Sequence, residues 1–244
     1  MDATTIGQAV GQLKTYILDT IQHNTLLKYT GTPLLNEKQL FFLLLPKLNE
    51  EAWTEETTTS AMTVGIVHAS LAEHDRIHET DATSKEQQLT VLSGDYYSGR
   101  YYQLLAQTGN VELIRKLSEA IVDRCEHEIT VYEREGRYFQ DWVKALSVIE
   151  TALIERFFYV YRFDSYLEVM QEALTAARLN RELEALIKGE PSVYVNCMQF
   201  SLGEQPVGEA LRQEISRRKQ IVTAILEAST YNEALKQAIV DIVS

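Results

Sequence analysis

Residues 67–79 read Val-His-Ala-Ser-Leu-Ala-Glu-His-Asp-Arg-Ile-His-Glu, and residues 92–102 read Leu-Ser-Gly-Asp-Tyr-Tyr-Ser-Gly-Arg-Tyr-Tyr. The first segment continues a helical pattern, because residues that face one side recur at three- and four-residue steps. The members of this stripe are Val64, Val67, His68, Leu71, His74, Asp75 and His78. We therefore expect one helix over about 55–79 and a second over 84–108, which Gly109 ends.

The same periodicity continues along almost the whole chain. Apolar residues at helical spacing predict further helices over about 4–24, 111–136, 138–163, 165–188 and 208–228, and a last one that Ser229 or Thr230 caps. The apolar run 40–45 is interpreted as a buried helix, because no partner strand is evident. The sequence shows no internal repeat, linker or low-complexity segment. It therefore predicts an all-α fold, a single-domain bundle of long helices spanning residues 1–244.

Composition narrows the class of protein. The chain has 244 residues, of which 45% are hydrophobic and 24% charged, as expected of a globular domain with a sizeable core. Its net charge of −12 disfavours nucleic acid and anionic membrane surfaces as partners. Cys125 and Cys197 form no metal-ligand spacing. The start has no signal-peptide pattern, and no apolar run reaches the roughly 20 residues of a membrane span, so we expect a cytoplasmic protein without a transmembrane segment.

Together, the two quoted segments resemble two motifs of the trans-prenyl diphosphate synthases, which read roughly SLIHDDxxDE and LLAGDYLLA. Catalytic members use the carboxylates of DDxxD, spaced along one helix face, to hold magnesium and the allylic diphosphate. At the same place this chain reads HDRIH, in which His74 and His78 replace two carboxylates. Imidazole nitrogen suits magnesium poorly, because this ion prefers oxygen ligands. The resemblance therefore implies that the helix is kept while the magnesium site is lost.

Three further motifs of that family are altered in the same direction. The segment 29–36, which matches the diphosphate-binding GGKRxRP, contains no arginine. The KTA-like step at 149–153 has Glu150 in place of the lysine. The second aspartate motif falls near 176–182, where no aspartate occurs. This pattern resembles one branch of the family, the small, non-catalytic component of two-component heptaprenyl diphosphate synthases.

The resemblance implies a degenerate isoprenoid-synthase fold and an accessory role. The chain would have no catalytic residue, metal or cofactor of its own and would be inactive alone. A catalytic component II would supply both aspartate motifs and Mg²⁺, bind farnesyl and isopentenyl diphosphates, and form a heterodimer with this chain. Such a prenyltransferase makes the heptaprenyl side chain of menaquinone, and the accessory subunit is needed for activity and chain length.

Two groups of site residues follow from the resemblance. Residues before the first aspartate motif line the product channel in family members, and here they are Ile66, Ala69 and Ser70, with a deeper stripe of Val64, Val67 and Leu71. The segment 91–106 should face the catalytic partner, with Tyr96, Tyr97, Tyr101 and Leu104 as candidate contacts.

Other interpretations of the same residues stay open. His68, His74 and Asp75 also fit the ligand set of an HD-type metal-dependent phosphohydrolase, which would need further ligands from other helices. His74 and His78 equally suit a solvated helix end. The channel residues equally suit an ordinary core, and the tyrosines suit a core as well as an interface.

Overall fold

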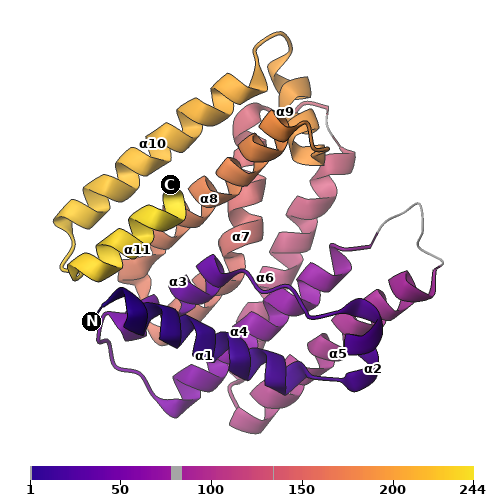
Figure 1. The fold of residues 1–244 in the computed structure, drawn as a ribbon, viewed down its shortest axis with the longest axis vertical. Coiled ribbons are helices and arrows are strands. Elements are labelled where there is room, and N and C mark those ends of the chain that lie inside the picture. Colours follow the sequence, from indigo (N-terminus) through magenta and orange to yellow (C-terminus); the bar gives the residue numbers. More distant parts are fainter. Residues whose placement is uncertain (1, 78–83, 134) are drawn as a thin grey trace. The chain divides into compact units, whose positions relative to one another are not determined.

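The computed structural model of the chain describes residues 2–77, 84–133 and 135–244, and every regular element in these ranges is helical (Figure 1). The predicted all-α fold is thus confirmed. The chain divides into two compact units, residues 2–117 and 118–244. The prediction of one domain over residues 1–244 stays a prediction. Among the described residues, no helix combines the length and the apolar character that crossing a bilayer demands.

The unit 2–117 is built around α4 (Glu55–His74), most of whose residues are buried. Its elements are α1 (Ala3–Ile21), α2 (Asn24–Thr30), α3 (Glu37–Leu48), α4 (Glu55–His74), α5 (Lys85–Thr108) and the start of α6 (Val111–Ile129). A capping box between Thr54 and Thr57 starts α4, which packs against α5, α1 and α3. Small residues such as Gly65 and Ala69 let its neighbours approach closely. The apolar run 40–45 lies inside α3, as predicted.

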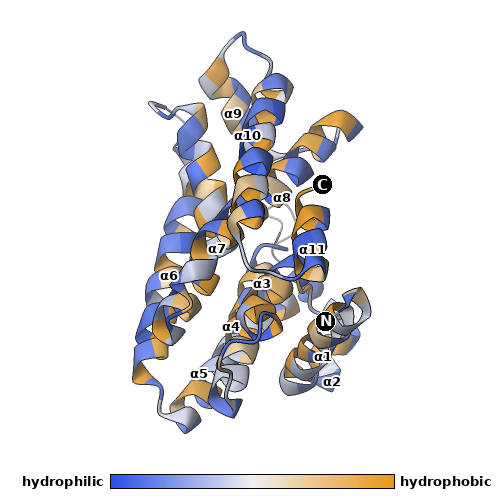
Figure 2. Ribbon diagram, turned by 90° about the vertical axis from the view of Figure 1, so that its left-hand side faces the viewer, coloured by the Kyte–Doolittle hydropathy of each residue, from blue (hydrophilic) through white to orange (hydrophobic). Residues whose placement is uncertain are grey.

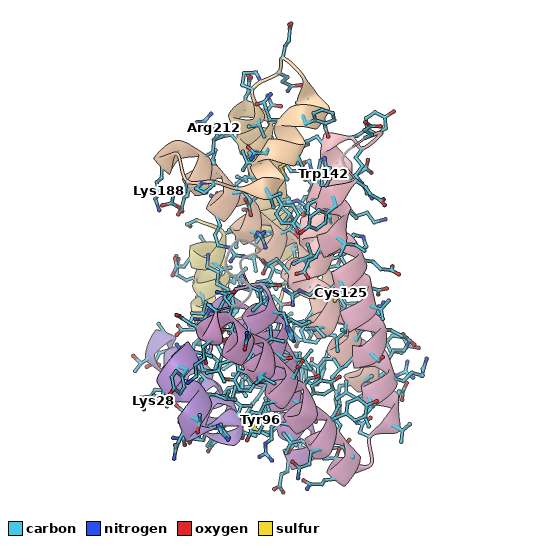
Figure 3. The ribbon with its side chains drawn as sticks, turned by 90° about the vertical axis from the view of Figure 1, so that its right-hand side faces the viewer. Lys28, Tyr96, Cys125, Trp142, Lys188 and Arg212 are labelled. Carbon is cyan, nitrogen blue, oxygen red and sulfur yellow. The ribbon has the colours of Figure 1, made fainter. Side chains whose placement is uncertain are left out.

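The unit 118–244 packs around α8. Its elements are the rest of α6, η2 (Thr130–Tyr132), α7 (Phe139–Tyr161), η3 (Asp164–Tyr166), α8 (Leu167–Lys188), α9 (Val193–Leu202), α10 (Val207–Ala228) and α11 (Glu233–Val243). Hydrophobic and hydrophilic residues alternate around α6 and α7, as amphipathic helices require (Figure 2). Trp142, labelled in Figure 3, is fully buried on α7, and its indole N–H donates to Ser201 Oγ at 2.8 Å. The buried indole of Trp142 therefore packs in the apolar core and also has a hydrogen-bond partner for its N–H group.

Three predicted helix ends were wrong. The helix expected to reach Glu79 stops at His74, because the amides of Arg76 and Ile77 donate to the carbonyls of Glu73 and His74, three residues back, in turns that do not continue the α-helix. The helix expected to reach Gly136 stops at Ile129 and tightens into η2. The last helix is capped by Asn232, whose side chain accepts from the Leu235 amide, and not by Ser229 or Thr230.

Candidate functional site

The quoted segments meet where the end of α4 packs on α5. Ser70 Oγ donates to the carbonyl of Gly94 at 2.8 Å. The ring of His74 lies directly over Gly94, so a Cβ added there would stand 2.6 Å from Nε2. His74 Nε2 is also 3.6 Å from a carboxylate oxygen of Asp95. Glycine at position 94 therefore leaves room for the His74 ring, which would have to shift if a Cβ were present.

A buried ion pair lies beside this contact. Glu73 is fully buried, and both of its oxygens accept from Arg76, at 3.1 and 2.9 Å. Ser93 Oγ donates to the same carboxylate at 3.3 Å, and Arg76 also donates to the carbonyl of Thr30 at 3.0 Å. The pair thus joins α4, α5 and the end of α2. Its carboxylate is already engaged by protein donors and is not presented as a metal ligand.

The degenerate aspartate motif does not assemble a metal site in the described part of the chain. Asp75 is exposed at the end of α4, and His74 turns toward Gly94 and Asp95. Of the predicted stripe, α4 carries the residues up to His74, and His78 lies outside the described residues. Within the described ranges, no three His, Cys, Asp or Glu side chains gather around one point. The phosphohydrolase interpretation with His68, His74 and Asp75 therefore finds no support there.

The product-channel candidates lie in the interior of the unit 2–117. Five of them are buried on α4 and Leu71 is half-buried; the buried ones are Val64, Ile66, Val67, Ala69 and Ser70. Their role in a product channel stays a prediction. What the structure adds is that the Ser70 hydroxyl is already bonded to α5, so any larger residue there must displace α5 packing.

The interface candidates divide into two pairs on α5. Tyr97 and Tyr101 are buried in the unit itself, whereas Tyr96 and Leu104 are half-buried. Among the large apolar side chains of α5, Leu92 and Tyr102 are the most exposed, at 54% and 51%. A contact surface on α5 stays a prediction. Its most exposed apolar residues, Leu92 and Tyr102, lie in the predicted segment 91–106 but are not among its four candidate contacts.

In the unit 118–244, the two other altered motifs meet each other. Glu150 of α7 is buried and accepts from Arg178 Nη1 at 3.0 Å and from Arg181. Arg178 Nε donates to Glu182 at 2.8 Å, and Glu182 also accepts from Ser192. At the position of the family's lysine this chain thus has the acidic Glu150, and in the region of the second aspartate motif it has the basic Arg178 and Arg181. The signs of charge at these two motifs are thus exchanged, and the two regions form ion pairs with each other.

Electrostatics fixes Arg178 in its charged form. Burial alone would lower the pKa of its guanidinium, but the carboxylates of Glu150 and Glu182 outweigh burial and raise it. A permanent cation at this position repels Mg²⁺ and cannot replace an aspartate as a ligand. The sequence analysis singled out Glu150 and the region 176–182 but did not predict that Glu150 pairs with Arg178. It also missed Glu73, Arg76 and Ser93; the only signal was the three-residue spacing of Glu73 and Arg76, which is common on solvated helices.

Most of the chain matches one known protein family. The model of the family "Heptaprenyl diphosphate synthase (HEPPP synthase) subunit 1" matches residues 23–228. Over 128 residues the chain is 32% identical to "Heptaprenyl diphosphate synthase component 1" of Geobacillus stearothermophilus, which covers 52% of this chain and 58% of that protein. The match therefore spans less than two thirds of that relative.

Solved structures show the same fold at low sequence identity. A heptaprenyl diphosphate synthase from Staphylococcus aureus is similar with a TM-score of 0.69 and 12% identity, covering 98% of this chain and 96% of that one. A decaprenyl diphosphate synthase from Rhodobacter capsulatus is similar with a TM-score of 0.65 and 14% identity, covering 99% and 96%. These similarities confirm the predicted prenyl synthase fold.

Proposed function

Because the chain belongs to the family of heptaprenyl diphosphate synthase subunit 1, we propose that it is the accessory, non-catalytic subunit of a two-component prenyl diphosphate synthase. The catalytic partner supplies both aspartate motifs and the Mg²⁺ ions, binds farnesyl and isopentenyl diphosphates, and forms all new bonds. The complex is a cytoplasmic heterodimer, and its product is the heptaprenyl chain of menaquinone.

The observation that carries this proposal is the exchange of charges between α7 and α8. An active site of this kind must present free carboxylates to magnesium and free cations to diphosphate. Here Glu150 is buried and engaged by Arg178 and Arg181, so its carboxylate is not free to bind magnesium. The occupied carboxylate of Glu73 supports the same conclusion in the other unit.

The net charge of the chain also favours a partner that holds the substrates. A chain with a net charge of −12 repels a diphosphate unless metal ions or cations of another protein stand between them. A partner with Mg²⁺ bound provides that compensation. This division of labour leaves to the accessory subunit the binding of the partner and the control of where chain growth stops.

The role in chain length is assigned to the buried face of α4 that includes Ala69 and Ser70. A phenylalanine at either place adds volume to a packed interior, which costs about 1–3 kcal/mol. We expect Ala69→Phe to shorten the product of the reconstituted pair. Because Ala69 is fully buried, the stability of the variant and its binding to the partner are measured first. An unshortened product from an intact, folded complex would remove α4 from the channel.

The experiment that tests the proposal is reconstitution. The full chain is purified alone, the catalytic subunit alone, and the two together, and each is assayed with farnesyl diphosphate, isopentenyl diphosphate and Mg²⁺. We expect long-chain product only from the mixture. Elongation by the isolated chain, or an equal rate and product from the isolated partner, would contradict an accessory role.

A further inference from the structure

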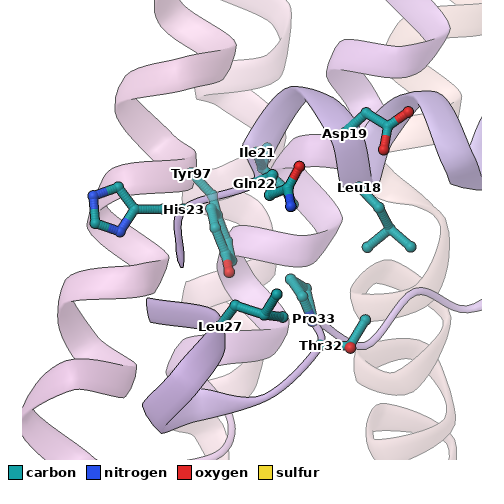
Figure 4. Close-up of a pocket in the computed structure, with 9 residues that line it drawn as sticks. All are labelled: Leu18, Asp19, Ile21, Gln22, His23, Leu27, Thr32, Pro33 and Tyr97. Carbon is teal, nitrogen blue, oxygen red and sulfur yellow. The ribbon is translucent and has the colours of Figure 1, made fainter. Parts of the chain in front are cut away.

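A pocket of about 180 Å³ lies in the unit 2–117, away from the residues considered so far as channel candidates. The end of α1, α2, the following loop and α5 form it (Figure 4). Its lining residues are Leu18, Asp19, Ile21, Gln22, His23, Leu27, Thr32, Pro33 and Tyr97. The apolar members make the walls, and the exposed polar members lie toward the surface. The pocket is thus open to solvent at a polar rim and apolar inside.

Tyr97 gives this pocket a buried polar group. The side chain is 2% exposed, and Figure 4 shows its hydroxyl pointing toward Leu27 and Pro33. No hydrogen bond to this hydroxyl is formed by any residue in the described ranges. Burial, with a smaller contribution from the charge of Glu73, raises the pKa of Tyr97 to about 12. The hydroxyl is protonated at neutral pH and can donate a hydrogen bond to a molecule in the pocket.

The charge of the lining residues decides which ligands fit. The described residues that line the pocket include one carboxylate, Asp19, and neither lysine nor arginine. The buried carboxylate of Glu73 also acts on Tyr97, and the charge of its partner Arg76 offsets part of this effect. His23 is already engaged, because its Nδ1 accepts the Leu26 amide at 3.4 Å and its ring packs edge-on against Tyr96. An anion, including any phosphate, is disfavoured in such surroundings.

Size sets the remaining limit. A cavity of about 150 Å³ lined by apolar residues holds a molecule as large as benzene. We propose that this pocket is a binding site for a small, neutral, mostly apolar molecule whose one acceptor oxygen takes the hydrogen bond of the Tyr97 hydroxyl. The inference stands apart from the accessory role, because it concerns binding to the isolated chain and requires no partner.

Three probes of similar size test the chemistry on the full chain. Benzyl alcohol offers a ring and an acceptor oxygen, toluene offers the ring alone, and benzoate offers a negative charge. Binding is followed by NMR, from the shifts of the Leu27 methyl groups and the His23 ring signals. We expect saturable shifts with benzyl alcohol, weaker binding of toluene, and binding of benzoate at least about fivefold weaker than that of benzyl alcohol.

Two variants connect binding to the pocket. Tyr97→Phe keeps the ring and removes the donor, so it should weaken benzyl alcohol about fivefold, a typical effect of one neutral hydrogen bond, and leave toluene unchanged. Leu27→Trp fills the pocket from its rim and should abolish the binding of both probes. Leu34→Trp is the matched control, because Leu34 is 63% exposed and does not line the pocket. The helix content of each variant is checked by circular dichroism.

Three outcomes would overturn the proposal. Shifts that do not saturate, or that Leu34→Trp removes as fully as Leu27→Trp, would show that the probes bind elsewhere. Equal affinity of benzyl alcohol for the chain and for Tyr97→Phe would show that the hydroxyl takes no part. Benzoate binding more tightly than benzyl alcohol would show that the pocket prefers anions.

Discussion

Removing the charge of Glu150 tests the charge exchange between α7 and α8. Its side chain is 6% exposed and serves Arg178, whose own side chain is 18% exposed. Glutamine has nearly the same shape, but it offers one neutral acceptor and turns an amide N–H₂ group toward the arginines. Glu150→Gln should therefore destabilise the chain without creating a cavity.

The magnitude follows from how far each arginine is buried. A hydrogen bond to a charged group contributes about 1.5–3 kcal/mol, and the buried Arg178 loses one of its two carboxylate partners. Arg181 is 55% exposed and regains water, so its loss adds only about 0.5 kcal/mol. The expected total is about 3 kcal/mol. For a chain of this length that corresponds to a fall in Tm of roughly 6–12 °C.

Thermal unfolding followed by circular dichroism measures this effect. The control is Glu184→Gln on α8, because the Glu184 side chain is 65% exposed and its ion-pair distance to Lys188 is long, at 3.8 Å. The control should change stability by less than about 0.5 kcal/mol. If Glu150→Gln unfolded within about 1 °C of the unchanged chain, the carboxylate would not be part of a buried ion pair, and the explanation of the lost site would be wrong.

Three further predictions concern α5 and α10. Gly99→Ala should stabilise the chain by about 0.5–1 kcal/mol, since a Cβ there meets open space and alanine favours the helix. Gly94→Ala should not show this gain, because its Cβ would collide with the His74 ring. Equal Tm values of the two variants would contradict the packing of His74 on Gly94. Burial would raise the pKa of Glu214, but the hydrogen bond from Arg217 and nearby charges lower it overall. The charged carboxylate therefore stabilises the chain fully above about pH 4.5, and this stabilisation is lost as the pH falls through the lowered pKa. Glu214→Gln should flatten the acid dependence of the free energy of urea unfolding, and an unchanged slope would refute this prediction. Leu92→Ala should weaken binding to the catalytic partner, measured by calorimetry, and leave Tm unchanged, because Leu92 is exposed. Tyr101→Ala should lower Tm, because Tyr101 is buried. The reverse pattern would place the interface elsewhere.

Helical periodicity predicted most of the fold, because the stripe of α1 and the apolar run of α3 admit few other structures. It failed at helix ends. Asn232 outcompetes Ser229 and Thr230 as a cap because its side chain reaches the Leu235 amide, and several acceptable caps in a row cannot be ranked from spacing. Periodicity also gives the stripe of a helix but not its cover, so Tyr97 and Tyr101 suited a core and an interface equally.

The candidate site was predicted as a set of losses, and the structure shows what replaced them. Glu150 was recognised by its reversed charge, but its pairing with Arg178 spans two helices and leaves no local pattern. Glu73 and Arg76 stand three residues apart, as do many solvated pairs, and only burial distinguishes them. Tertiary contacts, not sequence spacing, made these groups unavailable to magnesium.

The central claim is that this chain has no catalytic site of its own and acts through a partner. Its most direct test measures radiolabelled isopentenyl diphosphate incorporated into prenyl chains by the purified chain with Mg²⁺, before and after addition of the catalytic subunit. The account predicts no incorporation beforehand and long-chain product afterwards, with the chain and its partner eluting as one complex. Incorporation by the chain alone, or product made by a partner that never binds it, would contradict the account.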